Sequence, residues 1–144
     1  MRKGFDYIGV SVIFFCHDGK GNFLMQKRGP NTRDEKNVWD IGAGAIEFGD
    51  DVIDTLKREV LEEYSTDVLG YEFLGYRNSP REINGEKIHW VNLDFKVLVD
   101  REKAKNGEPH KFDEIDWFTF ENLPQPLHSQ EMIFLNKYKD KLCE

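Results

Sequence analysis

The sequence has few cysteines, no excess of positive charge and no long apolar run. Its two cysteines, Cys16 and Cys143, cannot form the disulfide framework of a small secreted protein, so a reducing, cytoplasmic setting is expected. A net charge of −7 is opposite to the basic surface that nucleic-acid-binding proteins need. No apolar run approaches the roughly 20 residues of a membrane-spanning helix. We therefore expect a cytoplasmic protein that binds neither nucleic acid polymers nor membranes.

The length and composition are those of a soluble globular protein. At 144 residues, with 39% hydrophobic and 33% charged residues, the chain suits one domain, 1–144, that buries most of its apolar surface. It has no internal repeat, no low-complexity tract and no linker rich in Pro, Gly or Ser. The N-terminus has no signal-peptide pattern. We expect a monomer or a homodimer.

The pattern of apolar and turn-forming residues predicts a mixture of strands and helices. Strands are expected at 7–16, 23–26, 71–76, 87–99 and 115–120, and helices from Asp50 or Asp51 to about Tyr64 and at 129–142. The dipeptide Asn84-Gly85 is a strong signal for a hairpin. The strand at 87–99 alternates apolar and polar residues, which places the apolar ones on one face. This order of elements indicates an α/β or α+β fold with a mixed β-sheet.

Three glutamates follow one another at helical spacing in the segment 44–66. Glu59, Glu62 and Glu63 stand at i, i+3 and i+4, which places them on one face of the expected helix. Like charges at these spacings destabilise an exposed helix by roughly 0.2–0.5 kcal/mol per pair. A solvated surface on which Arg58 pairs with Glu62 would accommodate them. A bound divalent cation would offset the repulsion directly.

Three neighbouring features favour the cation. The expected helix has an apolar stripe formed by Val52, Leu56 and Val60. Glu59 and Glu63 border this stripe, where isolated charge is costly. The glycine-rich loop 42–44 precedes the helix, and Glu47 and Asp50 add two carboxylates nearby. The segment is therefore interpreted as a metal site.

The segment 44–66 resembles the Nudix box, written G-x5-E-x7-R-E-U-x-E-E-x-G-U, in which U is a bulky aliphatic residue. The positions that match are Gly44, Arg58, Glu59, Val60, Glu62 and Glu63. Asp50 replaces the first glutamate, Ser65 the second glycine and Thr66 the last aliphatic residue. Asp50 is one methylene shorter than Glu, and it is also well suited to cap the helix. Glycine is favoured at position 65 for its positive φ, so Ser65 predicts a differently built turn.

The similarity to small members of the Nudix superfamily extends beyond the box. It includes Trp39, Ile46-Glu47-x-Gly49, Glu108-Pro109-x-Lys111, and Trp117-Phe118 ahead of Asn122-Leu123-Pro124. The fold that this resemblance implies is a Nudix-type α/β/α sandwich around a mixed β-sheet, which agrees with the order of elements above. Trp39 and Trp117 are interpreted as core residues rather than as stacking platforms for a nucleobase.

The resemblance implies a hydrolase of phosphoanhydrides that depends on Mg²⁺, with Mn²⁺ able to substitute. By this resemblance the metal ligands are Glu59, Glu62, Glu63 and the carbonyl of Gly44. Mg²⁺ takes oxygen ligands and keeps several of its waters, so a few carboxylates together with the substrate suffice. Arg58 is expected to orient a glutamate rather than to touch the substrate.

The general base is left open between two places. In the superfamily it is sometimes a box glutamate and sometimes an acid on a later loop, so Glu62 and Glu108 are both candidates. Asp113 and Glu114 lie in the same segment as Glu108. Each of these three later acids could instead be an ordinary solvated loop residue.

An acidic protein needs local basic residues to meet a phosphorylated substrate. Arg28 is favoured for this role, because it lies near the end of a strand that resembles the substrate-side strand of the family. Solvated surface charges are the better explanation for Lys27, Arg33 and Arg81. By resemblance, His128 and Gln130 lie in a region that contacts the base in some nucleotide-cleaving relatives. A turn or a helix cap would explain these two residues equally well.

The resemblance favours a nucleoside triphosphate as substrate, cleaved to a monophosphate and pyrophosphate as in the MutT-like branch. The sequence shows no additional N-terminal region like that of many ADP-ribose-cleaving relatives. ADP-ribose or another nucleotide sugar is the alternative substrate. A catalytically inactive domain that senses nucleotides or binds a protein is the alternative of another class, and the intact glutamates argue against it. Isopentenyl diphosphate isomerase shares the fold but needs a catalytic cysteine, whereas Cys16 lies within an expected strand.

Overall fold

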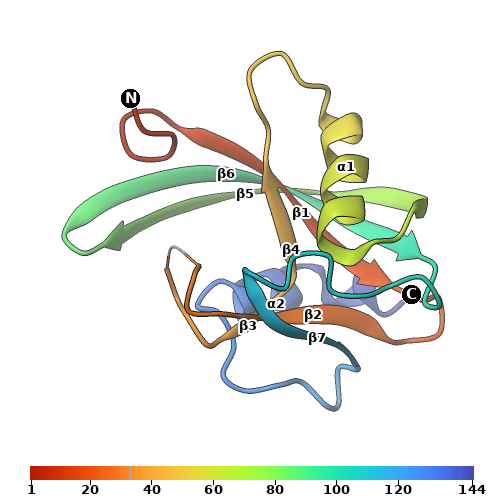
Figure 1. Cartoon of the computed structure of the whole chain (residues 1–144). Helices are drawn as coiled ribbons and strands as arrows, with labels where there is room; N and C mark the ends of the chain where they lie inside the picture. The colour runs from red at the N-terminus through yellow and green to blue at the C-terminus, as the bar shows by residue number, and fades with distance from the viewer. Residues whose placement is uncertain (33) are drawn as a thin grey trace.

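The computed structural model describes residues 1–32 and 34–144, arranged as Figure 1 shows. The strands are β1 (Gly9–His17), β2 (Phe23–Arg28), β3 (Trp39–Asp40), β4 (Gly42–Ala45), β5 (Val68–Ile83), β6 (Glu86–Val99) and β7 (Phe112–Phe118). The helices are α1 (Val52–Tyr64) and α2 (Glu131–Leu142). The predicted elements occur in the expected order, with the short strands β3 and β4 added between β2 and α1.

The strands of the described residues form one mixed sheet with β1 at its centre. The main order is β3-β2-β1-β6-β5, while β4 pairs with β1 and β7 pairs with β2. β1 runs parallel to β6, from Gly9 beside Trp90 to His17 beside Leu98. The other edge of β1 is shared by β4, along 11–14, and by β2, which meets it at His17. The predicted mixed sheet is confirmed.

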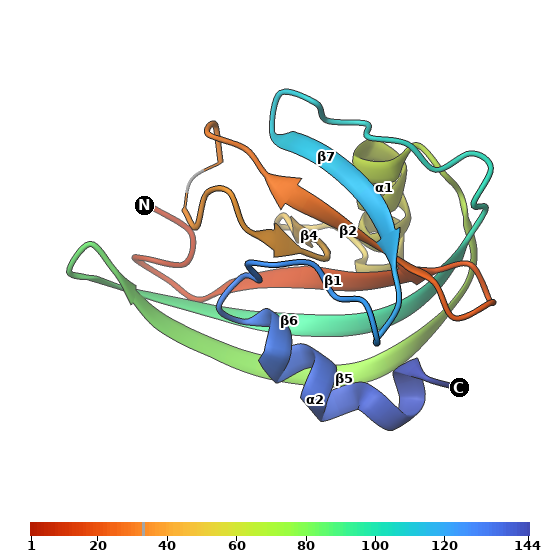
Figure 2. The same ribbon diagram turned by 90° about the horizontal axis from the view of Figure 1, so that it is seen from below.

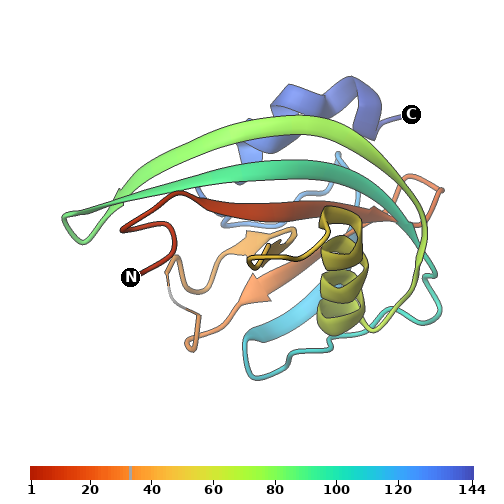
Figure 3. The ribbon, with the colours of Figure 1, turned by 90° about the horizontal axis from the view of Figure 1, so that it is seen from above.

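The two helices cover opposite faces of this sheet (Figures 2 and 3). Phe14 of β1 lies in a core under α1, and its neighbour Phe15 lies in a second core under α2. α1 contributes Leu56, Val60 and Tyr64, and α2 contributes Phe134, Leu135, Tyr138 and Leu142. Trp39 and Trp117 pack against these cores, as expected. Neither α1 nor α2, the helices of the described residues, is long and apolar enough to cross a membrane.

α1 begins directly after Asp51, which is its N-cap. The carboxylate of Asp51 accepts hydrogen bonds from the backbone N–H groups of Ile53 (3.0 Å) and Asp54 (3.1 Å). These bonds satisfy donors that the first turn of a helix leaves free. Asp50 lies one residue outside the cap, so the interpretation of Asp50 as the N-cap is wrong and that of Asp51 is confirmed.

The turn after α1 adopts the left-handed conformation although it carries a serine. Ser65 has a φ of 57°, and its N–H donates to the carbonyl of Leu61 (2.9 Å). The N–H of Gly107 donates to the carbonyl of Glu63 (2.9 Å). A Cβ at Gly107 would lie 2.1 Å from the carbonyl oxygen of Glu62, so glycine is needed for this approach. The prediction of a differently built turn is wrong, because these contacts offset the strain at Ser65.

The segment expected to be a glycine-rich loop is a strand, β4. It pairs antiparallel with residues 11–14 of β1. A Cβ at Gly42 would lie 1.9 Å from Cε2 of Phe14, and one at Gly44 would lie 2.3 Å from Cδ of Glu59. The two glycines therefore allow the side chains of Phe14 and Glu59 to pack directly against the backbone of β4. Their low strand propensity hid the strand from sequence analysis, and their small size brings α1 close to it.

β5 and β6 form a long hairpin that turns at Asn84-Gly85, as predicted. Both turn residues have positive φ, 53° and 80°, as a type I′ turn requires. β5 is longer than the expected 71–76 because it continues through Gly70, Gly75 and Pro80, which interrupt its pattern. The two glycines coincide with irregularities in the pairing of β5 with β6. On β6 the polar face is also covered, and Asp94 is fully buried.

Candidate functional site

The three glutamates of α1 differ strongly in exposure. Glu63 is only 2% exposed, and its carboxylate oxygen Oε2 has no hydrogen-bond partner among the described residues. Glu59 is partly buried and packs on Gly44 of β4. The side chain of Glu62 is 52% exposed. Exposure therefore increases from Glu63 through Glu59 to Glu62. The two acids that border the apolar stripe are the less exposed ones, as expected.

Burial raises the pKa of both inner glutamates. For Glu59 the charge of Glu62 adds to burial, and Arg58 opposes both. For Glu63 burial dominates; Lys111 opposes it, while other nearby carboxylates add to it. The protein's own cations therefore compensate this negative charge only in part.

A divalent cation fits this uncompensated charge. Oε2 of Glu63 is a buried acceptor without a donor, and Glu59 lies against the backbone of Gly44. Within residues 1–32 and 34–144 no three acidic, histidine or cysteine side chains converge as a ready-made cage. Mg²⁺ keeps several waters and needs only a few protein oxygens. The donors present are all oxygens, the ligand type that Mg²⁺ and Mn²⁺ prefer.

Arg58 lies among acidic side chains. Its guanidinium is 3.3 Å from Oδ2 of Asp50, 3.6 Å from Oε1 of Glu59 and 4.0 Å from Oε1 of Glu62. These contacts support the expectation that Arg58 orients glutamates. Asp50, the departure from the box pattern, is the nearest acidic partner of this arginine.

Glu108 is the later acid that lies beside the box. Its charge raises the pKa of both Glu59 and Glu63. Asp113 lies instead next to Gly29, where an added Cβ would be 2.9 Å from Oδ1 of Asp113. Glu114 is paired with a β2 residue in the sheet. Among the later acids the geometry therefore favours Glu108 as a candidate base, alongside Glu62.

A pocket of about 340 Å³ is lined in part by β4. It extends from Gly44 of β4, against which Glu59 packs, to Glu131 at the start of α2. Trp90 and Phe134 contribute aromatic surface to its wall. Its basic side chains are Arg28, Arg77, Arg81 and Lys111. Arg33 lies outside the described residues, and Lys27 does not line the pocket.

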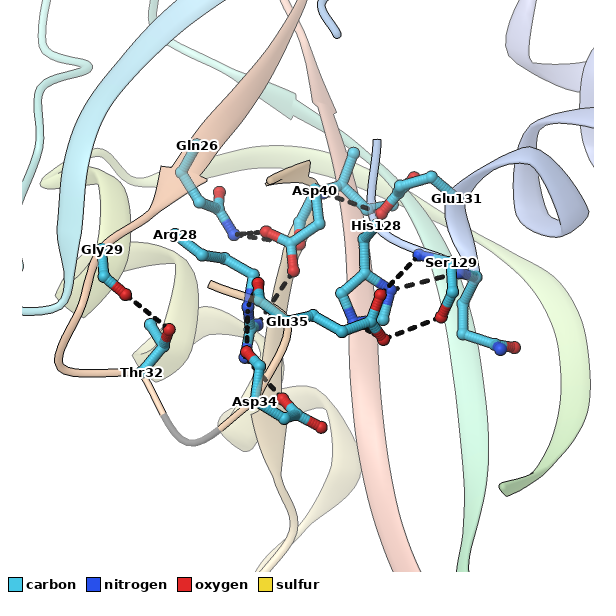
Figure 4. Close-up of polar contacts among 12 residues, drawn as sticks. Gln26, Arg28, Gly29, Thr32, Asp34, Glu35, Asp40, His128, Ser129 and Glu131 are labelled. Carbon is cyan, nitrogen blue, oxygen red and sulfur yellow. Dashed lines mark hydrogen bonds and ion pairs between the residues drawn. The ribbon is translucent and has the colours of Figure 1, made fainter. Parts of the chain in front are cut away.

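Arg28 lines the pocket, but its guanidinium is bound within the protein (Figure 4). Nη1 donates to Oδ2 of Asp40 (3.0 Å), and Nη2 donates to Oδ1 of Asp34 (2.8 Å). Nε donates to the backbone carbonyls of Asp34 and Glu35, each at 3.1 Å. The substrate-binding role of Arg28 stays a prediction, and these bonds leave it few free donors.

His128 and Gln130 also lie in the pocket wall. The backbone N–H of Gln130 donates to Nδ1 of His128 (3.1 Å), and Nε2 of His128 lies 2.9 Å from Oε2 of Glu35. Burial lowers the pKa of His128 to about 4, so the ring is neutral at pH 7 and donates from Nε2. His128 and Gln130 therefore form hydrogen bonds in the turn before α2 and also line the pocket. Their contact with a substrate stays a prediction.

A row of buried side chains links the box helix to the pocket, and sequence analysis missed it. Tyr64 of α1 donates to Oε1 of Gln26, and Nε2 of Gln26 donates to Oδ1 of Asp40 (2.9 Å; Figure 4). Asp40 in turn binds Arg28. Burial raises the pKa of Asp40 to about 7. The one signal was the presence of single polar residues inside apolar strand segments.

Glu131, the first residue of α2, was missed as well. It is 6% exposed, and its Oε1 accepts the backbone N–H of Ile41 (2.9 Å), while Oε2 has no partner among the residues described. Burial, and then the charge of Asp40, raise the pKa of Glu131 to about 8. The carboxyl is therefore protonated at pH 7 and adds a neutral polar group to the pocket wall. An acid in the first turn of a helix is common, so nothing in the sequence marked it.

Replacing Glu131 with glutamine is expected to flatten the pH dependence of stability. The folded-state pKa is about 8, against a usual value of 4.5. Protonation of Glu131 thus stabilises the native state at low pH, and this contribution is lost as the pH rises toward 8. Asp40 and Asp94 favour the neutral form, whereas Arg77 and the N–H of Ile41 favour the ionised one.

Urea unfolding of the native protein and of Glu131→Gln at about pH 5, 6.5 and 8 measures this effect. The free energy of unfolding of Glu131→Gln minus that of the native protein should increase by more than about 1 kcal/mol from pH 5 to pH 8. Parallel pH profiles for the two proteins would contradict the protonation of Glu131.

The NUDIX domain profile matches residues 8–137, a range that contains β4, α1 and the pocket. The chain belongs to the NUDIX domain family. Nudix proteins are generally phosphoanhydride hydrolases and typically use divalent metals. The resemblance of segment 44–66 to the Nudix box is thereby confirmed at the level of the family.

Solved Nudix structures share this fold. The MutT Nudix hydrolase from Burkholderia pseudomallei is 24% identical, with a TM-score of 0.79 over 91% of this chain and 98% of that one. The MutT protein from Methanosarcina mazei Go1 is 21% identical, with a TM-score of 0.72 over 95% and 96%. The Nudix domain of Shewanella oneidensis NrtR, complexed with ADP-ribose, is 15% identical, with a TM-score of 0.72 over 94% and 87%. The predicted Nudix fold, with a mixed sheet and two helices, is confirmed.

Proposed function

We propose that this Nudix domain is a Mg²⁺-dependent pyrophosphohydrolase that cleaves a nucleoside triphosphate to a monophosphate and pyrophosphate. The observation that carries the proposal is the buried Oε2 of Glu63, which has no hydrogen-bond partner within residues 1–32 and 34–144. Glu59 lies near it and packs on Gly44, which also lines the pocket. The acidic face of α1 and the pocket thus meet at β4, where the phosphates of a bound nucleotide would lie.

The metal ligands in this proposal are Glu59, Glu62, Glu63 and the carbonyl of Gly44. Bound Mg²⁺ supplies neutralisation of phosphate oxygens and a more acidic water. Arg58 holds Glu59 and Glu62 in position through its contacts with their carboxylates. The protein thus contributes carboxylate and carbonyl oxygens for the metal beside a pocket that has polar side chains in its wall.

The hydrolytic step needs a nucleophile and a proton acceptor. A water oxygen bonds to one phosphorus of the anhydride, and the bridging P–O bond breaks with its electron pair leaving on the departing phosphate. A carboxylate takes the proton that the water loses. Glu62 and Glu108 are the two candidates, because the charge of each acts on Glu59 and both therefore lie close to the acids of α1.

The far end of the pocket supplies groups suited to a nucleoside. Trp90 and Phe134 offer aromatic surface, and His128 and Gln130 lie in the wall at the start of α2. The neutral carboxyl of Glu131 offers one further hydrogen bond from Oε2, which has no partner in the part of the protein that the structure describes. A base that presents polar edges could be held here by hydrogen bonds and by apolar contact.

ADP-ribose or another nucleotide sugar is the second candidate substrate. The NrtR Nudix domain complexed with ADP-ribose shares the fold. The alternative of another class is an inactive domain that senses nucleotides or binds a protein. An isomerase that relies on cysteine is disfavoured, because Cys16 is fully buried and burial raises the pKa of its thiol.

A phosphate-release screen tests the proposed function. The compounds are nucleoside triphosphates, ADP-ribose, nucleotide sugars and dinucleoside polyphosphates, each with Mg²⁺ and with a chelator. We expect release of pyrophosphate from a nucleoside triphosphate, with loss of turnover when the metal is removed. Turnover of ADP-ribose alone would move the assignment to the second candidate. No turnover of any compound would favour the inactive domain.

A further inference from the structure

Of the four basic side chains that line the pocket within residues 1–32 and 34–144, three are paired with acids. Arg28, Arg77 and Arg81 form ion pairs with aspartate or glutamate at N–O distances of 2.8, 2.7 and 3.0 Å. The fourth, Lys111, forms no ion pair in the part of the chain that the structure describes. Among the residues that the structure describes, its ammonium group is therefore the basic charge in the pocket wall that remains for a ligand.

The backbone of Lys111 is fixed just ahead of β7. Its N–H donates to the carbonyl of Glu108 (2.9 Å), and its carbonyl accepts the N–H of Gly29 (3.0 Å). The ammonium group lies 5.3 Å from the centroid of the Phe112 ring. The side chain is half-buried. Lys111 thus differs from a fully solvated lysine. Its backbone hydrogen bonds and the partial burial of its side chain restrict where the ammonium group can lie.

The charge of Lys111 acts on both ends of the site. Burial raises the pKa of Asp40 in the pocket wall and that of Glu63 on α1, and the charge of Lys111 opposes part of each rise. The two carboxyls belong to different elements, β3 and α1. Lys111 consequently lies within electrostatic reach of both the pocket and the acids assigned to the metal.

We propose that Lys111 binds a phosphate oxygen of the substrate at the junction between the pocket and the acids of α1. This inference rests on the proposed function and adds a residue to it. An ammonium group is a compact charge with three donors. Its hydrogen bonds to phosphate are of the strong, charge-assisted kind. Within the pocket wall this charge can turn to a phosphate without breaking an existing ion pair.

Titration with inorganic pyrophosphate in saturating Mg²⁺ tests the proposal without requiring turnover. Lys111→Met should raise the Kd for pyrophosphate about 10- to 100-fold, the range for a hydrogen bond to a charged group. Lys111→Arg should retain most of the affinity. Lys27→Met is the matched control and should bind as the native protein does, because Lys27 does not line the pocket.

A second titration separates phosphate binding from a structural role. Thermal unfolding against Mg²⁺ concentration gives the half-saturating Mg²⁺ of each protein. In Lys111→Met this value should stay equal or fall, because a positive charge near Glu63 has been removed. Weaker binding of pyrophosphate and of Mg²⁺ together would indicate damage to the fold and would overturn the inference.

Two further outcomes would also overturn it. One is unchanged pyrophosphate affinity in Lys111→Met, and the other is the absence of pyrophosphate binding by the native protein. Failure of the proposed function is seen separately, as the absence of hydrolysis by the native protein in the substrate screen.

Discussion

Glu63→Gln is expected to stabilise the metal-free protein and to reduce turnover by about three orders of magnitude. Glu63 is buried, and its Oε2 has no hydrogen-bond partner in the described part of the chain. Removing its negative charge should raise the free energy of unfolding by about 1–3 kcal/mol in the presence of a chelator. Loss of a metal ligand removes several kcal/mol of transition-state stabilisation, which gives the fall in turnover. Urea unfolding and the phosphate-release assay measure the two effects.

Glu62→Gln is the matched control, because its side chain lies on the same helix but is 52% exposed. It should reduce turnover while leaving the metal-free stability within about 0.5 kcal/mol of the native value. Glu63→Gln should also lose most of the stabilisation that Mg²⁺ gives the native protein. A Glu63→Gln protein that is both less stable and fully active would show that this carboxylate is structural.

Asp94→Asn is expected to destabilise the protein by about 3–5 kcal/mol. Asp94 is fully buried and accepts hydrogen bonds from Nε (2.7 Å) and Nη2 (2.9 Å) of Arg77. Tyr138 of α2 donates to the same carboxylate (2.7 Å). The asparagine keeps the shape but removes the charge, so the buried guanidinium is left uncompensated. Chemical denaturation measures the loss.

Glu72→Gln provides the control for this experiment. The pair between Glu72 and Lys141 is long (3.8 Å), and both side chains are about half exposed. Breaking it should cost less than about 1 kcal/mol. Similar losses in the two variants would mean that the pair between Arg77 and Asp94 contributes no more than a surface contact.

The box helix could be predicted because its signals are local. The cap, the apolar stripe and the graded burial of the three glutamates all follow from residue types within segment 51–64. Asp50 and Asp51 are the same residue type and suit a cap equally well, so residue type alone did not choose between them. The shape of the turn at Ser65 depended on contacts outside the segment. Gly107 and its neighbours close that turn from more than 40 residues away, and no local pattern marks such a contact.

The pocket was much harder to predict than the acids. Arg77 and Asp94 lie in paired strands, but alternation alone does not say that α2 covers their face. Glu131 has the appearance of an ordinary first-turn acid, and its burial follows from the position of the backbone of Ile41. Lys111 was recognised as part of a family pattern, yet its role as an unpaired charge depends on which other cations the fold neutralises. These features are set by tertiary neighbours.

The parallel pairing of β1 with β6 also sets the order in which the site can be assembled. A ribosome-bound chain that has emerged only as far as α1 contains the box glutamates and the first four strands. It lacks β6, which flanks β1, and it lacks Glu108. Such non-local pairing delays folding until the second half of the chain has been synthesised. The glutamates of α1 therefore stay hydrated, and their mutual repulsion stays weak, during much of translation.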